Sequence, residues 1–251
     1  MSISCKNCNT TIDSKFCPAC GQVATTKRFT TRDLFSDFFQ RVFPLEKGFL
    51  YSTRRLFLAP GAMLRGYLDG QRANHSKPMP YLFIATAAST LILKTTFAKQ
   101  IIQQQPDINT PQQIEKATAM ANFVTGNLNL IMVLLIPFIA LMSWLLFKKS
   151  KYNYAEHLVV NIFVFAVFML FSLPTVIPYL LGVSATVQRA ISTAITLLGL
   201  LFCAWAYIGV FQPGNKIVGG IKAMISISLG FIIGIFFFSL TGAPLLAYFF
   251  K

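Results

Sequence analysis

The chain has 251 residues, of which 55% are hydrophobic and only 12% are charged. A soluble domain of this length needs more charge to cover its surface, so the composition excludes an ordinary soluble protein. The formal net charge of +14 could suggest nucleic-acid binding, but the basic residues crowd into the first 77 residues and two short loops. That placement is typical of the cytoplasmic flanks of membrane spans, so no nucleic-acid partner is expected.

The first segment in chain order carries four cysteines, and residues 5–21 read CKNCNTTIDSKFCPACG. The spacing C-x2-C-x8-C-x2-C puts each pair of thiolates on one tight turn, as two corners of a tetrahedron require. Gly21 permits the left-handed backbone of such a turn, and Asn9 takes the same place in the first pair. Four thiolates favour structural Zn2+, with the ligands Cys5, Cys8, Cys17 and Cys20.

Other interpretations of these cysteines are weaker. Disulfides rarely persist in a reducing cytosol, a thioredoxin-like site needs a βαβ context, and a rubredoxin-like iron site has a longer gap between its pairs. Four protein ligands leave no open position on zinc, so zinc catalysis is not expected. The first 25 residues lack the apolar region of a signal peptide. We therefore expect residues 1–28 to form a cytosolic zinc ribbon with its linker.

Residues 29–77 are basic, aromatic and apolar by turns, and they predict amphipathic helices on the cytoplasmic face. The apolar residues of 29–43 recur at helical spacing, which predicts a helix either in the membrane interface or packed on the spans. Residues 48–72 predict two short helices broken at Pro60, with Gly70 as the final cap. This basic collar would turn six arginines toward lipid headgroups: Arg32, Arg41, Arg54, Arg55, Arg65 and Arg72.

The remaining residues, 78–251, predict about five transmembrane helices, because about 20 apolar residues span the hydrocarbon core. We expect these spans at residues 80–97, 128–147, 157–171, 190–211 and 217–240. Pro174 and Pro178 could kink or end the third span, and the apolar tail after the fifth is too short to cross again. The predicted fold class is an all-α polytopic membrane protein with an N-terminal zinc ribbon and an amphipathic-helix collar.

The basic residues also predict the orientation of the spans. With the N-terminus inside, 17 of the 22 lysines and arginines lie on the cytoplasmic side. Five spans then place the C-terminus outside, together with the polar loop 100–122 and a helix expected at 110–121.

Little in the chain points to catalysis, and no enzyme is expected. None of the eight acidic residues falls in the middle of a span, which argues against a proton-driven pump. Glu156 and His157 could form an acid/base pair facing a lipid headgroup, or they could simply begin an interfacial helix. Asn127, Asn129 and Asn161 lie near or within spans, where interhelical hydrogen bonding is their expected role.

The fifth predicted span carries a row of small residues at four-residue spacing. Such a row lets helices approach closely, either within one chain or between two copies in a homo-oligomer. Its members are Ser226, Gly230 and Gly234.

The first 90 residues resemble an uncharacterised bacterial family of zinc-ribbon membrane proteins, classed under a domain of unknown function. An FCPxCGQ motif at residues 16–22 precedes the matching positions Thr53, Leu56, Pro60, Gly61, Tyr67, Gly70, Arg72, Pro78, Tyr81 and Leu82. The stretch 74–76 departs from the family pattern. The resemblance implies a bacterial cytoplasmic (inner) membrane location and a zinc ribbon, but no activity. The five-span layout is more loosely similar to the Yip family, which carries no function.

Three functions are open to such a sequence. The closed metal site and the basic collar favour a membrane scaffold or regulator that docks a cytosolic protein partner or anionic lipid. Polar residues and prolines within the spans leave a channel or facilitator as the alternative. A lipid-modifying enzyme that uses Glu156 and His157 is the third.

Overall fold

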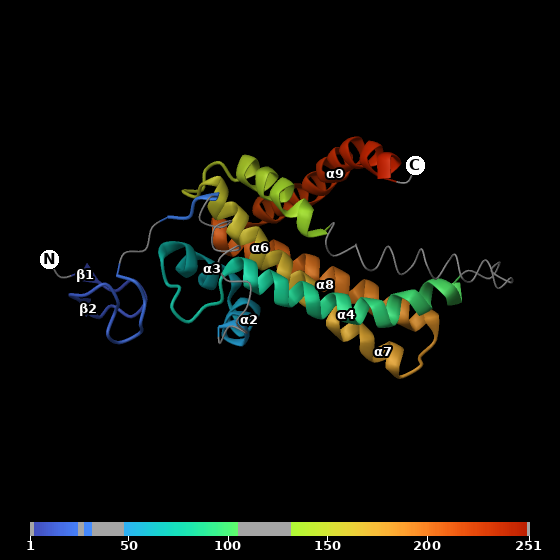
Figure 1. The fold of residues 1–251 in the computed structure, drawn as a ribbon, viewed down its shortest axis with the longest axis horizontal. Coiled ribbons are helices and arrows are strands. Elements are labelled where there is room, and N and C mark those ends of the chain that lie inside the picture. Colours follow the sequence, from blue (N-terminus) through green and yellow to red (C-terminus); the bar gives the residue numbers. More distant parts are fainter. Residues whose placement is uncertain (1–2, 25–27, 32–47, 105–131, 250–251) are drawn as a thin grey trace.

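The computed structural model describes residues 3–24, 28–31, 48–104 and 132–249 (Figure 1). It is mostly helical, with a small ribbon at the N-terminus in which β1 (Ile3–Ser4) pairs antiparallel with β2 (Thr11–Ile12). Figure 1 shows the ribbon at one end of a helical bundle, on the same side as α3. The helix predicted at 29–43 falls mostly outside the described residues, as does most of the loop 100–122. Outside them too are Arg32, Arg41, Asn127 and Asn129.

Eight helices can be followed in the described residues. They are α2 (Phe49–Leu58), α3 (Pro60–Asp69), α4 (Pro78–Gln104), a helix at Met132–Leu146, α6 (Tyr154–Leu170), α7 (Val176–Leu180), α8 (Ala185–Phe211) and α9 (Lys216–Phe249). The predicted break at Pro60 is confirmed, since α3 begins with this proline in its first turn. Gly70 caps the end of α3 in the left-handed region, with φ of 115°.

Three helical segments are long and apolar enough to cross a membrane, which indicates a membrane protein. They are Tyr154–Leu180, Thr186–Phe211 and Lys216–Phe238. Large apolar side chains on α8 and α9 face outward, such as Leu201 (67% exposed) and Ile232 (62% exposed). Lipid accommodates such surfaces, whereas water does not. The prediction of five spans is not confirmed beyond these three. Residues 80–97 lie within α4, and the helix Met132–Leu146 covers all but Phe147 of the described part of 128–147.

The third predicted span begins three residues earlier than expected because α6 has its own start signal. The Asn153 side chain accepts the backbone N–H of Glu156, and the Glu156 carboxylate accepts the backbone N–H of Asn153. This capping box satisfies two N–H groups at the helix start. At the other end, α6 stops at Leu170, and a 3-10 turn that contains Pro174 leads into α7.

The last two helices are longer than predicted. The fourth predicted span was expected at residue 190, but α8 begins at Ala185. The apolar tail predicted to follow the fifth span is instead the end of α9, which runs to Phe249.

The core lies where α3, α4, α6 and α8 meet. Phe163 of α6 is fully buried between Tyr67 of α3 and Tyr81 of α4, with ring centroids 5.1 and 5.3 Å away. The segment predicted as a collar is therefore packed on the bundle through α3. Arg54 and Arg55 are exposed, while Arg65 and Arg72 are half-buried.

The small-residue row of α9 packs on the helix Met132–Leu146 of the same chain. A Cβ atom added to Gly230 would lie 2.5 Å from Cα of Ile139, and one added to Gly234 would meet the side chain of Leu135. Ser226 is fully buried, and its hydroxyl donates to the carbonyl of Lys222. Of the two uses predicted for this row, close packing within one chain is the one observed.

Candidate metal centre

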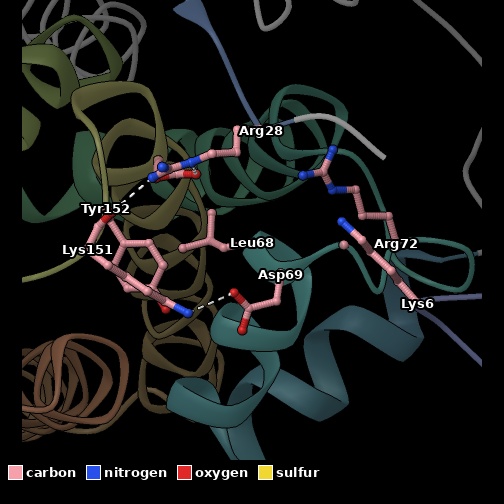
Figure 2. Close-up of a pocket in the computed structure, with 9 residues that line it drawn as sticks. Lys6, Arg28, Leu68, Asp69, Arg72, Lys151 and Tyr152 are labelled. Carbon is pink, nitrogen blue, oxygen red and sulfur yellow. Dashed lines mark hydrogen bonds and ion pairs between the residues drawn. The ribbon is translucent and has the colours of Figure 1, made fainter. Parts of the chain in front are cut away.

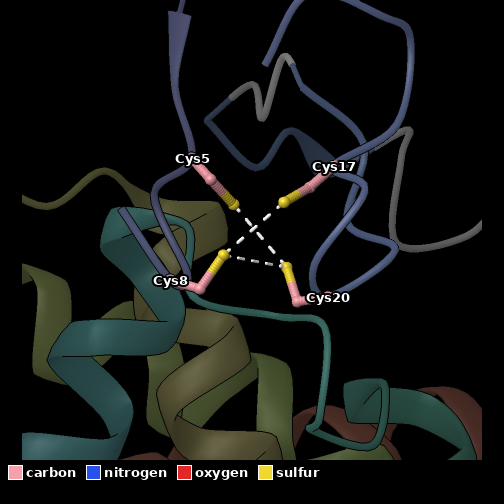
Figure 3. A group of neighbouring side chains, drawn as sticks. All are labelled: Cys5, Cys8, Cys17 and Cys20. Atoms are coloured by element: carbon pink, nitrogen blue, oxygen red, sulfur yellow. Dashed lines mark hydrogen bonds between the residues drawn. The ribbon is translucent and has the colours of Figure 1, made fainter. Parts of the chain in front are cut away.

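The four cysteines of the ribbon come together in one cluster (Figure 3). All four Sγ atoms lie within 4.8 Å of one another. Three of the distances that join the two halves of the motif are 3.5 to 3.6 Å, namely Cys5–Cys20, Cys8–Cys17 and Cys8–Cys20. A regular tetrahedron with metal–sulfur bonds of about 2.3 Å has edges of about 3.8 Å. The spacing of the thiols therefore fits one metal ion, and these four residues could hold it.

The backbone around each pair of cysteines follows the same path. Asn9 N–H donates to the carbonyl of Cys5, and Gly21 N–H donates to the carbonyl of Cys17. Asn9 and Gly21 both adopt positive φ, at 60° and 71°. The left-handed turns predicted at these two positions are confirmed, and they explain why glycine or asparagine follows each pair.

Burial differs between the four thiols. Cys5 and Cys17 are buried with Ile12 in the small ribbon core, whereas Cys8 is exposed. Hydrogen bonding with the Thr10 side chain, 3.3 Å from Cys8 Sγ, lowers the pKa of the Cys8 thiol to about 6. Desolvation and hydrogen bonds with the other thiols raise the pKa of Cys20 to about 11, so Cys8 loses its proton before Cys20 does. The thiolate is the form that binds a metal ion.

Gln22 attaches the ribbon to the helical core. This side chain follows the last cysteine pair and is buried. Its amide N–H donates to the carbonyl of Gly70, at 2.8 Å, and its carbonyl oxygen accepts the backbone N–H groups of Arg72 and Ala73, both at 3.0 Å. Both polar ends of the amide are thus used at the C-terminal end of α3, where helix carbonyls need partners.

The residues after the ribbon make a second attachment, at the start of α6. Arg28 donates twice to the Glu156 carboxylate, at 2.9 and 2.6 Å, and once to the carbonyl of Lys151. Phe29 is buried, and its ring stacks on Tyr67 with centroids 5.8 Å apart. The ribbon was predicted to end in a polar linker, but on either side of residues 25–27 the chain is fixed to the core.

The suggested acid/base pair points in two directions. Glu156 has a 3% exposed side chain that caps α6 and binds Arg28. His157 is fully buried, with Nδ1 2.9 Å from Ser143 Oγ, Nε2 3.2 Å from Ser150 Oγ, and its ring stacked on Phe211. The observed roles of the two side chains are those of a helix start and a packed core residue.

A polar network crosses the bundle beside His157. Asn161 donates to Ser143 Oγ at 3.1 Å, and the Tyr207 hydroxyl donates to the Asn161 carbonyl oxygen. The prediction that Asn161 hydrogen-bonds between helices is confirmed. Ser143 and Tyr207 were not singled out, although a polar residue within an apolar span is a signal that could have found them.

Comparison with known proteins adds one match. A family model described as a protein of unknown function (DUF3667) matches residues 46–90, which include α2, α3 and the start of α4. No curated protein and no solved structure matches the chain. The matched segment is the one that carries Gly70 and Arg72, so the ribbon rests directly on it.

Proposed function

We propose that this protein is a non-enzymatic scaffold or regulator of the bacterial cytoplasmic (inner) membrane, with a cytosolic N-terminus and an external C-terminus. Its zinc ribbon and basic collar would dock a cytosolic protein partner or anionic lipid. One observation carries the proposal. Gln22 holds the ribbon against α3 through a buried contact, and Arg28, just after the ribbon, binds the buried Glu156 at the start of α6, so the ribbon presents a fixed surface beside the bundle.

Zinc is the metal that we propose for the four cysteines. Four thiolates at tetrahedral spacing suit Zn2+, and a closed ligand set leaves no coordination position for a substrate. Zinc would then hold the ribbon in shape so that Gln22 can reach α3. A ribbon of this size has only Cys5, Ile12 and Cys17 as its buried core and needs the metal to fold.

The described bundle favours docking over conduction. The polar side chains that suggested a channel, Asn161 among them, bond with one another and thereby tie the helices together. The groove of about 320 Å³ beside them is lined mainly by apolar side chains such as Phe165, Leu200 and Phe231. An apolar groove offers an ion or polar solute nothing to replace its water, whereas it suits lipid chains.

The test compares partners of the full chain with partners of a variant whose ribbon is intact but detached. We would cross-link native membranes that contain the wild-type protein, the double variant Gln22→Ala with Arg28→Ala, or the surface control Lys15→Gln. Each protein that the double variant loses is then purified, and its affinity for all three proteins is measured. We expect at least about tenfold weaker binding to the detached form, since about 1.4 kcal/mol of lost contact suffices. Identical partners and affinities for all three proteins would refute the docking role.

A further inference from the structure

A charged cleft separates the ribbon from the helical core (Figure 2). Its volume is about 240 Å³, far above the roughly 10–15 Å³ that a single ordered water needs. Four segments supply its charged walls: the ribbon, the described residues 28–31 that follow it (the strap), the end of α3 and the start of α6. The charged lining residues are Lys6, Arg28, Asp69, Arg72, Lys151 and Glu156.

The lining side chains carry an excess of positive charge. Among the described residues that line it, four are basic and two are acidic, a net charge of +2. The acids pair with two of the bases, Arg28 with Glu156 and Lys151 with Asp69, the latter at 3.1 Å. The same contact with Asp69 raises the pKa of Lys151. Figure 2 shows Lys6 and Arg72 on the other side of the cleft from Lys151 and Tyr152.

Arg72 is already held in place. Its Nε donates to the carbonyl of Tyr67 at 3.1 Å, and its guanidinium lies over the Phe29 ring, 3.7 Å from the centroid. A cation that is ordered beforehand loses little entropy when an anion arrives. Gathering cations from four segments costs electrostatic repulsion, which a bound anion relieves.

We propose that this cleft binds a phosphate monoester group, which Lys6 and Arg72 contact directly. The inference rests on the proposed function, because it names the anionic group that the docking site takes. A phosphate monoester carries about −1.5 to −2 charges near neutral pH, close to the surplus in the cleft. Guanidinium groups match phosphate oxygens in geometry, and lysine adds a point charge. A phosphate held between Lys6 and Arg72 would clamp the ribbon to the end of α3.

Two sources offer the same chemistry. The start of α6 lines the cleft and is also the start of the candidate span Tyr154–Leu180, so lipid headgroups are within reach. Phosphatidic acid presents a phosphate monoester at that level. A soluble phosphate monoester could enter from the aqueous side instead.

The experiment uses the full-length, metal-loaded protein in nanodiscs, in two arms. The first arm titrates inorganic phosphate into phosphatidylcholine nanodiscs and follows binding by calorimetry at constant ionic strength. The second arm titrates a fluorescent phosphatidic acid into the same nanodiscs, with fluorescent phosphatidylglycerol, a diester, as comparator. The variants are Lys6→Gln and Arg72→Gln, and the matched control is Lys15→Gln, an exposed ribbon lysine that does not line the cleft. Metal content and hydrogen exchange verify that each variant keeps its ribbon folded.

We expect saturable binding at one site per chain in at least one arm, with phosphatidic acid preferred over the diester in the lipid arm. Lys6→Gln should weaken it about three- to tenfold, as loss of a partly exposed charged contact does, while Lys15→Gln changes it less than twofold. Binding confined to one arm supports the site and identifies the source. No saturable binding in either arm, or equal weakening by Lys6→Gln and Lys15→Gln, overturns it. Lys6→Gln and Arg72→Gln keep the attachment through Gln22 and Arg28, which the partner comparison removes, so the docking role and this site can fail separately.

Discussion

The close crossing of α3 and α8 gives the sharpest test of the fold. Gly61 of α3 faces Gly209 of α8, and a Cβ atom added to Gly61 would lie 2.5 Å from the Cα and carbonyl carbon of Gly209. Ordinary contact begins at 3.4 Å, so Gly61→Ala must push the helices apart by about 1 Å. The neighbouring atoms are backbone and cannot rotate away. Overpacking of this kind costs about 1–3 kcal/mol.

The helix propensity of alanine offsets part of that cost. Gly→Ala inside a helix gains at most about 1 kcal/mol, and less in the first turn, where Gly61 lies. The net loss should be about 1–2 kcal/mol, which lowers the melting temperature by roughly 2–8 °C for a chain of this size. The assay is the apparent melting temperature in a single detergent, followed by tryptophan fluorescence.

Gly220 provides the matched control, since it also lies in a helix but a Cβ atom there would meet only Ile208 Cδ1, at an ordinary 3.7 Å. Gly220→Ala should therefore raise the melting temperature by up to about 4 °C. Gly209→Ala should fall between the two, because its nearest backbone atom is 2.8 Å away and it gains helix propensity. If Gly61→Ala melts as high as Gly220→Ala, the packing argument is wrong.

Three further predictions concern the ribbon and its neighbours. Cys8→Ser should reduce bound metal from one ion per chain to nearly none, whereas the buried Cys203→Ser should leave it unchanged; elemental analysis decides between these outcomes. Gln22→Ala removes three hydrogen bonds worth about 2–4 kcal/mol together and should speed amide exchange across residues 3–24 while sparing α6, and equal protection would contradict it. Burial, and then the charge of Arg55, lower the pKa of His75 in the folded chain from 6.5 to about 4. As the pH drops from 6.5 to 4, the unfolded chain therefore protonates this histidine before the folded chain does, so the free energy of unfolding should fall. His75→Gln should flatten that slope in melts recorded across this range, and an unchanged slope would refute the assignment.

Sequence reasoning was strongest where a local rule decides the structure. The cysteine spacing and the residue after each pair predicted the turns at Asn9 and Gly21, because backbone sterics act within a few residues. Pro60 and Gly70 marked the ends of α3 for the same reason. The start of α6 was missed although its signal is local too. Asn153 followed three residues later by Glu156, just before an apolar run, is a capping box.

Contacts between distant segments were not predictable from one sequence. Nothing in the local pattern shows that Gln22 reaches Gly70 or that Arg28 reaches Glu156 across 128 positions. Gly61 was interpreted only as a position of the family pattern beside the break at Pro60, yet its close approach to Gly209 depends on how α3 crosses α8. Such pairings follow from tertiary packing, whereas the periodicity of apolar residues describes only one helix at a time.

The attachment of the ribbon also explains how a carboxylate can be buried at the start of an apolar helix. Glu156 is 3% exposed and needs a positive partner, which its own helix does not supply within the first turn. Arg28 provides that charge from the strap behind the ribbon, while its own side chain stays 63% exposed. Removing Arg28 therefore leaves a buried charge, whereas removing Glu156 leaves a solvated one. The ribbon, the matched segment and the start of α6 thus depend on one another, and a change at the candidate metal centre has a direct physical route to the helical bundle.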